Sequence, residues 1–324
     1  LPKFVSPRIE QSSSLPTSMD CFSTEDTYTL DDLSRWQRDG TSLAVLGYPV
    51  RHSISPAMHN AALQELSITH PQFADWKYFR FEIRPEALIE ALPIFHEKGF
   101  LGLNLTVPHK EIALPALPQV DPAAQEIGAV NTLKRIDTGY SGFNTDGFGL
   151  ESGIRKELGR ELADTDIVIL GAGGAGRAAA VQALRCACKS LTIVNRNPER
   201  LSKLMQAIEP IARKRDIPLA AIAPGDSSLT IPEGALLINA TSLGLKTDDP
   251  LPIPANALSA SIGLYDMVYN PPSTKLMNAV DSVGGRSANG LSMLVYQGVR
   301  ALEIWSDQTI NPDTMDCAAR VAIA

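Results

Sequence analysis

The feature that most constrains the fold is the segment DTDIVILGAGGAGRAAAVQAL, residues 164–184. In residues 166–170, DIVIL, an apolar and mostly β-branched run follows Asp166, which is typical of a strand buried on both faces. A G-x-G-x-x-G turn begins at Gly171, and residues 177–184 are alanine-rich and helix-prone. Glycines in such a turn let backbone N–H groups approach a pyrophosphate at the positive end of the helix. This order of strand, glycine turn and helix predicts a dinucleotide-binding unit rather than a tight turn without a ligand.

The segment after the next predicted strand indicates which dinucleotide binds. An NAD site has an Asp or Glu about 20 residues past the glycines, where its carboxylate accepts from the ribose 2′-hydroxyl. This chain has Asn195, Arg196 and Asn197 there, and Arg200 follows Arg196 by one helical turn. Glu199 is acidic but falls inside the predicted helix. Because a guanidinium suits a 2′-phosphate, the pattern favours NADP; two solvated surface arginines are the alternative.

Composition and charge limit the class of protein. A chain of 324 residues is too long for one comfortable core and suggests two domains. The net charge of −7 argues against nucleic acid or an anionic membrane as a partner, and no apolar run is long enough to cross a bilayer. Four cysteines do not make a disulfide scaffold, and the C-x-C pair Cys186 and Cys188 lacks a second pair of metal ligands nearby. We therefore expect buried thiols, no metal site and a cytoplasmic protein.

Strand-like and helix-like segments alternate from residue 43 onward, which predicts an α/β fold. Toward the end of the chain, residues 288–305 have the pattern of a long amphipathic helix. Residues 1–40 are different, because Pro, Ser and acidic residues dominate and only residues 29–36 suggest a short helix. We expect this segment to be an extension that is loosely packed or poorly ordered.

A second group of polar residues lies outside the dinucleotide unit. The segment NLTVPHK places Thr106 and Lys110 near the end of a predicted strand, where open α/β sheets bind ligands. The segment GFNTDG places Asp146 at another strand end, and Asn131 lies between them in sequence. A lysine beside a carboxylate can pass a proton to or from an alcohol oxygen while hydride moves on the neighbouring carbon. Taken singly, Lys110 also fits a surface lysine and Asp146 an N-cap.

Two serines precede the first predicted helix of this region. Ser55 fits an N-cap before Pro56, and this needs no function. Ser53 and Ser55 together also make a corner that can bind a carboxylate at the helix start. His52 and His109 are weaker acid–base candidates, because no partner can be assigned to either from the sequence.

With these residues assembled, the chain resembles the shikimate dehydrogenase family, which includes NADP-dependent enzymes of aromatic amino-acid (chorismate) biosynthesis. The resemblance spans roughly residues 43–305 and keeps the family's motifs in order. These motifs are GYPVRHSISPAMHN, NLTVPHK, GAVNTL, GFNTDG, GAGGAGRA, NRNPER, INATSLG, YDMVYNPPSTKLM and NGLSMLVYQG. Asn197 stands where the family's adenosine motif usually has Thr.

The resemblance implies two α/β domains with a cleft between them. The substrate-binding catalytic domain would comprise residues 41–146 and 289–324, because the C-terminal helix returns to it. A Rossmann-type NADP-binding domain would comprise residues 147–288. The implied reaction is the reversible reduction of 3-dehydroshikimate to shikimate by NADPH, in a monomer or homodimer.

The resemblance also implies a role for each site residue. Lys110 and Asp146 would be the catalytic pair. The substrate carboxylate and ring hydroxyls would be bound by Ser53, Ser55, Thr106, Asn131, Tyr269 and Gln297. The cofactor would be held by Gly171, Ala172, Gly173, Gly174, Ala175, Asn195, Arg196, Asn197, Arg200, Met267 and Gly290.

Three alternatives remain open at this point. A quinate or dual quinate/shikimate dehydrogenase using NAD or NADP belongs to the same family. A non-catalytic member that binds the ligand as a sensor is another class, although the presence of Lys110 and Asp146 argues against it. A protein similar to methylene-folate dehydrogenase shares the general architecture, but HSISP and GFNTDG do not favour it.

Overall fold

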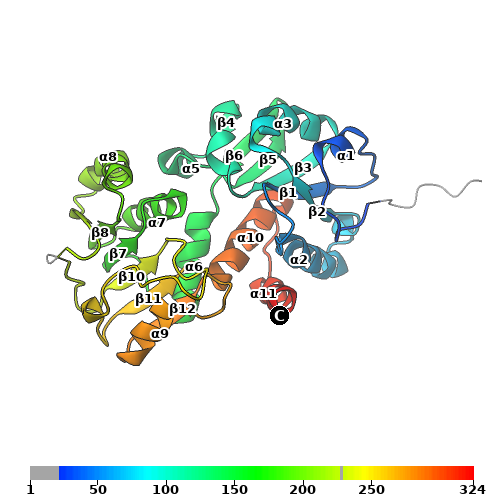
Figure 1. The fold of residues 1–324 in the computed structure, drawn as a ribbon. Helices are drawn as coiled ribbons and strands as arrows, with labels where there is room; N and C mark the ends of the chain where they lie inside the picture. The colour runs from blue at the N-terminus through cyan, green and yellow to red at the C-terminus, as the bar shows by residue number, and fades with distance from the viewer. Residues whose placement is uncertain (1–21, 227–228) are drawn as a thin grey trace, which may run out of the picture.

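The computed structural model describes residues 22–226 and 229–324, and it contains two six-stranded sheets. The sheets lie at opposite ends of the molecule, and two long helices, α6 (Asp146–Leu158) and α10 (Leu291–Ser306), run between them (Figure 1). The α/β fold expected from the sequence, with a Rossmann-type half, is confirmed.

The first sheet has the order β2-β1-β3-β5-β6-β4. Its strands are β1 (Ser42–Gly47), β2 (Lys77–Glu82), β3 (Phe100–Leu105), β4 (Gln119–Val120), β5 (Thr132–Ile136) and β6 (Gly139–Phe143). β1 pairs in parallel with β2 and β3, whereas β5 is antiparallel to β3 and β6. Side chains of β1 alternate between the faces: Ala44 and Leu46 belong to one core, and Leu43 and Val45 to another.

Helices and short 3₁₀ turns cover both faces of the first sheet. One core lies under α3 (Leu88–Glu97), and the other lies under α2 (Ser55–Thr69), α10 and the C-terminal α11 (Pro312–Ile323). The remaining short elements are η1 (Pro71–Phe73), η2 (Pro85–Ala87), α4 (His109–Ile112), η3 (Leu114–Ala116) and α5 (Pro122–Ile127).

The described part of the N-terminal segment packs tightly on the first sheet. Thr29 caps α1 (Leu30–Ser34) with a capping box, and Leu33 and Trp36 are buried. Phe22 stacks on Trp36 with ring centroids 3.9 Å apart, and Tyr28 forms a bridge to Phe81 of the edge strand β2. The expectation of loose packing is therefore wrong for residues 22–40, because aromatic burial fixes them. Residues 1–21 lie outside the described residues.

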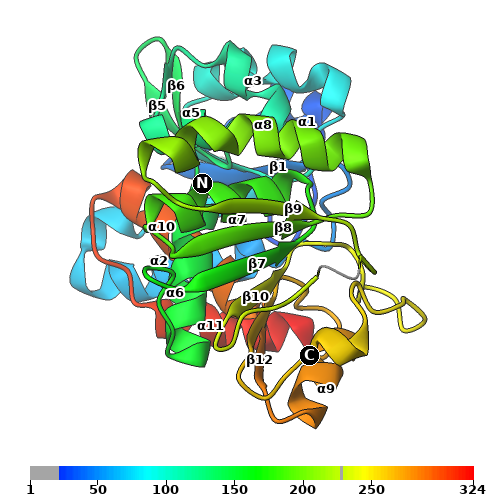
Figure 2. The ribbon, with the colours of Figure 1, turned by 90° about the vertical axis from the view of Figure 1, so that its left-hand side faces the viewer.

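The second sheet is parallel and has the order β12-β11-β10-β7-β8-β9. Its strands are β7 (Asp166–Leu170), β8 (Ser190–Val194), β9 (Leu219–Ile222), β10 (Leu236–Asn239), β11 (Gly263–Asp266) and β12 (Arg286–Asn289). Figure 2 shows β9, β8, β7 and β10 one below the other in this order. Strand order reverses between β7 and β10, and ligands bind at such a switch point in doubly wound sheets.

Both faces of the second sheet are also covered. Ile167 and Ile169 pack with α6, α7 (Gly174–Arg185) and α8 (Pro198–Lys214), whereas Val168 and Leu170 pack with α9 (Lys275–Ser282). A short 3₁₀ turn, η4 (Ala255–Ala257), lies between β10 and β11. Among the described residues, none of the helices is both long enough and apolar enough to span a membrane.

Glycines allow α6 and α10 to pack closely at the junction of the two sheets. A Cβ on Gly149 would lie 2.9 Å from the backbone nitrogen of Gln297 in α10. Buried apolar side chains of α10, among them Val295 and Trp305, belong to the core of the first sheet. The sequence places α10 after β12 of the second sheet, so this helix carries the chain back to the first.

Candidate active site

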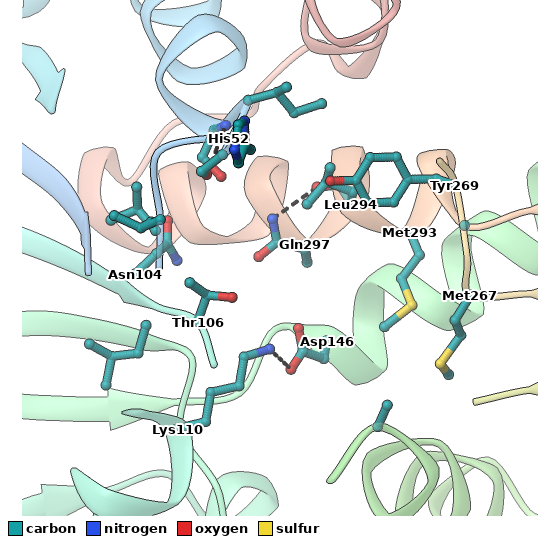
Figure 3. A pocket seen from close by; sticks show the side chains of 18 of the residues that line it. His52, Asn104, Thr106, Lys110, Asp146, Met267, Tyr269, Met293, Leu294 and Gln297 are labelled. Atoms are coloured by element: carbon teal, nitrogen blue, oxygen red, sulfur yellow. Dashed lines mark hydrogen bonds and ion pairs between the residues drawn. The ribbon is translucent and has the colours of Figure 1, made fainter. Parts of the chain in front are cut away.

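A cavity of about 520 Å³ lies between the two sheets. Its walls come from the segments after β1 and β3, the start of α6, the segment after β11, and α10 (Figure 3). Ten of the residues predicted for the site line it: Ser53, Ser55, Thr106, Lys110, Asp146, Ala175, Met267, Tyr269, Gly290 and Gln297. Residues that are distant in sequence therefore meet at one place.

Lys110 and Asp146 form an ion pair at the wall of this cavity. Lys110 lies on α4, and its Nζ is 2.7 Å from Asp146 Oδ2; the side chains are 30% and 13% exposed. Asp146 is the first residue of α6, but its carboxylate does not cap the helix, whose N-cap is Thr145. Lys110 is thus more than a solvated surface lysine, and Asp146 is not an N-cap. The pair can hold or move a proton.

Asn131 supports Asp146 from behind and does not line the cavity. It is 2% exposed, and its Nδ2 donates to Asp146 Oδ1 at 2.9 Å and to Thr145 Oγ1 at 3.0 Å. Its Oδ1 accepts from the backbone nitrogen of Thr145 at 2.8 Å. Gln297 Oε1 lies 3.4 Å from Asn131 Nδ2. The amide therefore fixes the loop that presents the Asp146 carboxylate.

Ser53 and Ser55 lie where α2 begins. The prediction that Ser55 caps this helix is wrong, because Ile54 is the N-cap residue and no side chain caps it. Instead, Ser55 is the first helical residue, and its backbone nitrogen donates to Ser53 Oγ at 3.4 Å. Both serines and Tyr269 line the cavity near the helix start, where N–H groups and the dipole favour an anion.

Asn104 was not predicted and lines the same cavity. It lies in β3, is 6% exposed, and accepts a hydrogen bond from the hydroxyl of Tyr78 at 2.8 Å. Its Nδ2 donates to Asn131 O and to Thr132 Oγ1, both at 3.0 Å. An amide inside the otherwise apolar strand FLGLNL was the sequence signal that could have identified it.

The two histidines have different positions. His52 lines the cavity, so it remains near the site. His109 is fully buried and does not line it, and burial lowers the pKa of His109. Within the described residues, no cluster of three or more His, Cys, Asp or Glu side chains could hold a metal ion.

The glycine turn after β7 opens toward the cleft. α7 begins at Gly174 with Gly173 as its N-cap, and no side chain caps it. A Cβ on Gly173 would meet nothing within 4 Å, and one on Gly174 would meet only Glu111 Oε1 at 3.5 Å. A Cβ on Gly176, in contrast, would collide with the carbonyl oxygen of Gly171. The turn thus combines tight packing with an open face that fits a pyrophosphate.

The segment after β8 extends this open face. Asn195 Oδ1 accepts from the backbone nitrogen of Ala172 at 3.3 Å, so the segment touches the glycine turn. Asn197 caps α8 by accepting from the backbone nitrogen of Arg200 at 2.8 Å. Arg196 and Arg200 are exposed, and no carboxylate of the described chain forms an ion pair with either. Two uncompensated guanidinium groups beside a dinucleotide turn fit a 2′-phosphate.

Met267 and Gly290 connect the second sheet to the cavity. The backbone nitrogen of Met267 donates to Asn239 O at 3.0 Å, and that of Gly290 donates to Val268 O at 3.2 Å. A Cβ on Gly290 would collide with the carbonyl oxygen of Met267. Both residues line the cavity. Figure 3 shows Met267 on the other side of Asp146 from Lys110, where the reactive end of a dinucleotide would meet a substrate.

Comparisons with known proteins give a consistent result. The model of the shikimate dehydrogenase substrate binding domain matches residues 45–133, and that of the shikimate 5′-dehydrogenase C-terminal domain matches residues 290–320. Shikimate dehydrogenase (NADP(+)) of Moorella thermoacetica is 37% identical over 284 residues, covering 87% of this chain and 93% of the relative.

Two solved structures illustrate the similarity in three dimensions. Shikimate 5-dehydrogenase of Thermus thermophilus, in complex with NADP(H) and shikimate, is 34% identical and has a TM-score of 0.73; the match covers 87% of this chain and 99% of that one. The ligand-free 5-ketofructose reductase of a Gluconobacter species is 28% identical with a TM-score of 0.78, covering 88% and 99%. The fold is therefore compatible with more than one carbonyl substrate.

Proposed function

Because this chain belongs to the shikimate dehydrogenase family, we propose how its own side chains carry out the reaction of that family. The chain is an NADP-dependent oxidoreductase that acts on a CH–OH group. It catalyses the reversible reduction of 3-dehydroshikimate to shikimate, a step of aromatic amino-acid biosynthesis. The observation that carries the proposal is the ion pair of Lys110 and Asp146 on the wall of the cavity.

Lys110 is the proton donor of the reduction. Its ammonium gives a proton to the oxygen of the ring ketone as that oxygen becomes a hydroxyl, and it takes the proton back in the reverse direction. Asp146, 2.7 Å away, keeps the ammonium directed into the cavity. Asn131 holds the Asp146 carboxylate in place through the hydrogen bond to Oδ1. We keep the predicted contact of Asn131 with a ring hydroxyl as part of the proposal.

The rest of the cavity orients the ring. Ser53, Ser55 and Tyr269 bind the substrate carboxylate, because two hydroxyls and a helix start form an anion-binding corner there. Thr106 and Gln297 bind ring hydroxyls from the wall between this corner and Lys110. Figure 3 shows Gln297 between Tyr269 and Thr106, with Lys110 and Asp146 below them in this view. Several contacts along the ring fix the ketone oxygen beside Lys110.

The cofactor lies along the open face described above. Gly171, Ala172, Gly173, Gly174 and Ala175 hold the pyrophosphate, and Asn195, Arg196, Asn197 and Arg200 hold the adenosine with its 2′-phosphate. Met267 and Gly290 flank the nicotinamide. Bound NADPH supplies the hydride for the ring carbon.

The proposal includes the finer assignments of domains, assembly and compartment. Residues 41–146 with 289–324 form the substrate-binding catalytic domain, and residues 147–288 form the NADP-binding domain. We propose a monomer or homodimer. A cytoplasmic location is supported by Cys186, Cys188 and Cys317, which are free thiols.

The function is tested by steady-state oxidation of shikimate and of quinate, each with NADP and with NAD. We expect the highest kcat/KM for shikimate with NADP, because the two serines suit shikimate and the two arginines suit the 2′-phosphate. Faster turnover of quinate would identify a quinate dehydrogenase instead. Saturable shikimate binding without turnover under any of the four conditions would support a sensor.

A further inference from the structure

The loop that carries Ser53 is held in place by one strand. Residues 51–54, here called the serine loop, lie between β1 and α2. Arg80 and Glu82 are two residues apart on β2, so their side chains point to the same face of the sheet. Glu82 Oε2 lies 3.4 Å from the backbone nitrogen of Val50 and 3.6 Å from Arg51 Nε. The neighbouring side chains Phe79 and Phe81 point into the core on the other face.

Arg80 makes the strongest contacts with this loop. Its Nη1 donates to the carbonyl oxygens of Arg51 at 2.8 Å and Ser53 at 2.9 Å. Its Nη2 donates to the carbonyl oxygen of Glu25 at 2.7 Å. A guanidinium presents these donors in a rigid plane, so the three carbonyl oxygens are fixed relative to one another. No ion pair of Arg80 with a carboxylate occurs within residues 22–226 and 229–324.

Besides the contacts of Glu82 and Arg80, the loop has local hydrogen bonds, among them one from the backbone nitrogen of Ser53 to the carbonyl oxygen of Val50 at 2.9 Å. Arg80 does not line the active-site cavity but lines a second cavity of about 470 Å³. The two cavities share His52, Ser53, Ile54 and Tyr269, so the serine loop forms a thin wall between them. Ile54 packs against the core of the first sheet, whereas Arg51 and His52 are exposed, so packing fixes only one end of the loop. The hydrogen bonds from Arg80 to the carbonyl groups hold the other end, from Arg51 to Ser53.

Glu25, whose carbonyl oxygen accepts from Arg80, belongs to a segment that is itself held on β2. Glu25 belongs to the N-terminal segment whose rings pack on β2: Phe22 stacks on Trp36, and Tyr28 makes edge contacts with Trp36 at 5.3 Å. The backbone of Tyr28 also exchanges hydrogen bonds with Arg80 and Glu82 of β2. The N-terminal segment therefore reaches the serine loop through the side chain of Arg80.

We propose that Arg80 is a positioning residue for recognition of the substrate carboxylate. By fixing the carbonyl groups of Arg51 and Ser53, it sets the direction of the Ser53 hydroxyl at the start of α2. The N-terminal segment takes part in substrate binding through the carbonyl of Glu25. This inference rests on the proposed function, because it takes Ser53 and Ser55 as the carboxylate-binding corner.

The test compares Arg80→Met, Arg80→Lys and the wild type, with shikimate and its methyl ester as substrates. We expect R80M to raise the KM for shikimate about 10-fold, because displaced contacts weaken ground-state and transition-state binding. R80K keeps the charge but loses the fork, so a rise of about 3-fold is expected. The KM for NADP stays unchanged in both. Arg35→Met is the control, since Arg35 lies directly after α1 in the same segment and its side chain is 76% exposed.

Comparing shikimate with its methyl ester shows whether Arg80 positions the carboxylate-binding corner or only stabilises the fold. The wild type prefers shikimate to the ester, which lacks the negative charge, and we expect R80M to lose most of this preference. A lower melting temperature with an unchanged preference would overturn the proposal, as would an unchanged KM for shikimate. If R80M does not fold, the KM of R80K for shikimate and its preference for shikimate over the ester test the proposal instead.

Calorimetry distinguishes this proposal from the proposed function. If the wild type binds shikimate without turnover, the proposed function fails, and a weaker binding of shikimate by R80M still supports the role of Arg80. If the wild type does not bind shikimate at all, both fail.

Discussion

The substrate-side wall and the cofactor-side wall of the cleft satisfy their polar groups in different ways. On the substrate side, Asp146 already receives Lys110 and Asn131, and the amide of Asn131 is engaged on both of its polar atoms. On the cofactor side, Gly173 faces open space and Arg196 is exposed. The polar side chains of the substrate-side wall are held by one another, whereas the cofactor-side wall presents hydrogen-bond donors that a ligand can use. Substitutions in the two walls should therefore have different consequences.

The largest effect is expected for Lys110→Ala. Loss of the proton donor should reduce kcat about 10³-fold, whereas the affinity for NADPH stays nearly intact because the cofactor-side wall is untouched. Lys134→Ala is a matched control: Lys134 is also 30% exposed and lies 3.4 Å from Asp307, but it does not line the cavity. Stopped-flow turnover and NADPH fluorescence titration measure the two quantities. Unchanged turnover would exclude the proposed mechanism.

The second effect tests the open wall. The double substitution of Arg196 and Arg200 by Ser should raise the KM for NADP about 10- to 100-fold. This corresponds to about 1.4–2.8 kcal/mol, and each exposed charge pair contributes less than a buried one because solvent weakens it. The KM for shikimate and the weak activity with NAD should not change. Arg213→Ser is the control, because Arg213 lies on α8 with Arg200 and its side chain is 78% exposed. Equal losses with NADP and NAD would show that these arginines do not read the 2′-phosphate.

The sequence predicts local features of the two walls better than contacts between segments that are distant in the chain. The glycine turn was predictable, because strand, turn and helix are contiguous and each has its own local pattern. The ion pair of Lys110 and Asp146 was predicted as a pair, but only the fold brings α4 beside the start of α6. The position of Asn131 behind Asp146, and the part played by Asn104, depend on pairing between β3 and β5. No hairpin turn joins β3 and β5, so the sequence between them does not indicate their register.

The N-terminal segment shows a second limit. Its composition suggested loose packing, but its aromatic side chains pack in one core with Phe79 and Phe81 of β2. They are Phe22, Tyr28 and Trp36. These aromatic residues are not spaced with the period of a helix or a strand, so the sequence did not indicate that they pack together. The cap at Ser55 failed for a different reason, because the helix begins one residue earlier than the residue type suggested.

A third effect compares the same residue type in the two walls. Asn131→Ala leaves the backbone nitrogen of Thr145 and Asp146 Oδ1 without their buried partner, so we expect a loss of about 2 kcal/mol in the free energy of unfolding. Asn195→Ala removes contacts at a partly exposed loop, where water can replace them, and should cost less than about 1 kcal/mol. Urea denaturation of both variants measures this. Equal losses would mean that the walls do not differ in their internal support.

The smallest effect concerns pH, and its sign differs between the two halves. Burial lowers the pKa of His59, under the first sheet, to about 3, so folded His59 stays neutral while the unfolded imidazole protonates near pH 6.5. Its contribution to stability is therefore lost as pH falls below about 6.5. Burial raises the pKa of Asp266, in the second sheet, so the folded carboxyl protonates before the unfolded one and stability rises as pH falls.

Denaturation at pH 7.5 and 5.5 tests this difference. His59→Phe keeps a ring to stack on Tyr78 and should remove about 1 kcal/mol of the acid-induced loss. Asp266→Asn should remove a gain in stability that the wild type shows as the pH falls further toward 3.8, which a third measurement at about pH 4 tests. An identical pH dependence in the wild type and both variants would contradict these assignments.

The packing of α10 and α11 on the first sheet also has a consequence for synthesis of the chain. These helices are translated after the second sheet, yet they cover the face of the first sheet that carries Leu43, Val45 and Tyr78. The first sheet must therefore wait, with this apolar face uncovered, while the whole second sheet is translated. Uncovered apolar surface on a nascent chain favours aggregation and chaperone binding. Under heat stress, newly made chains should therefore aggregate sooner than chains in which α10 and α11 already cover the first sheet.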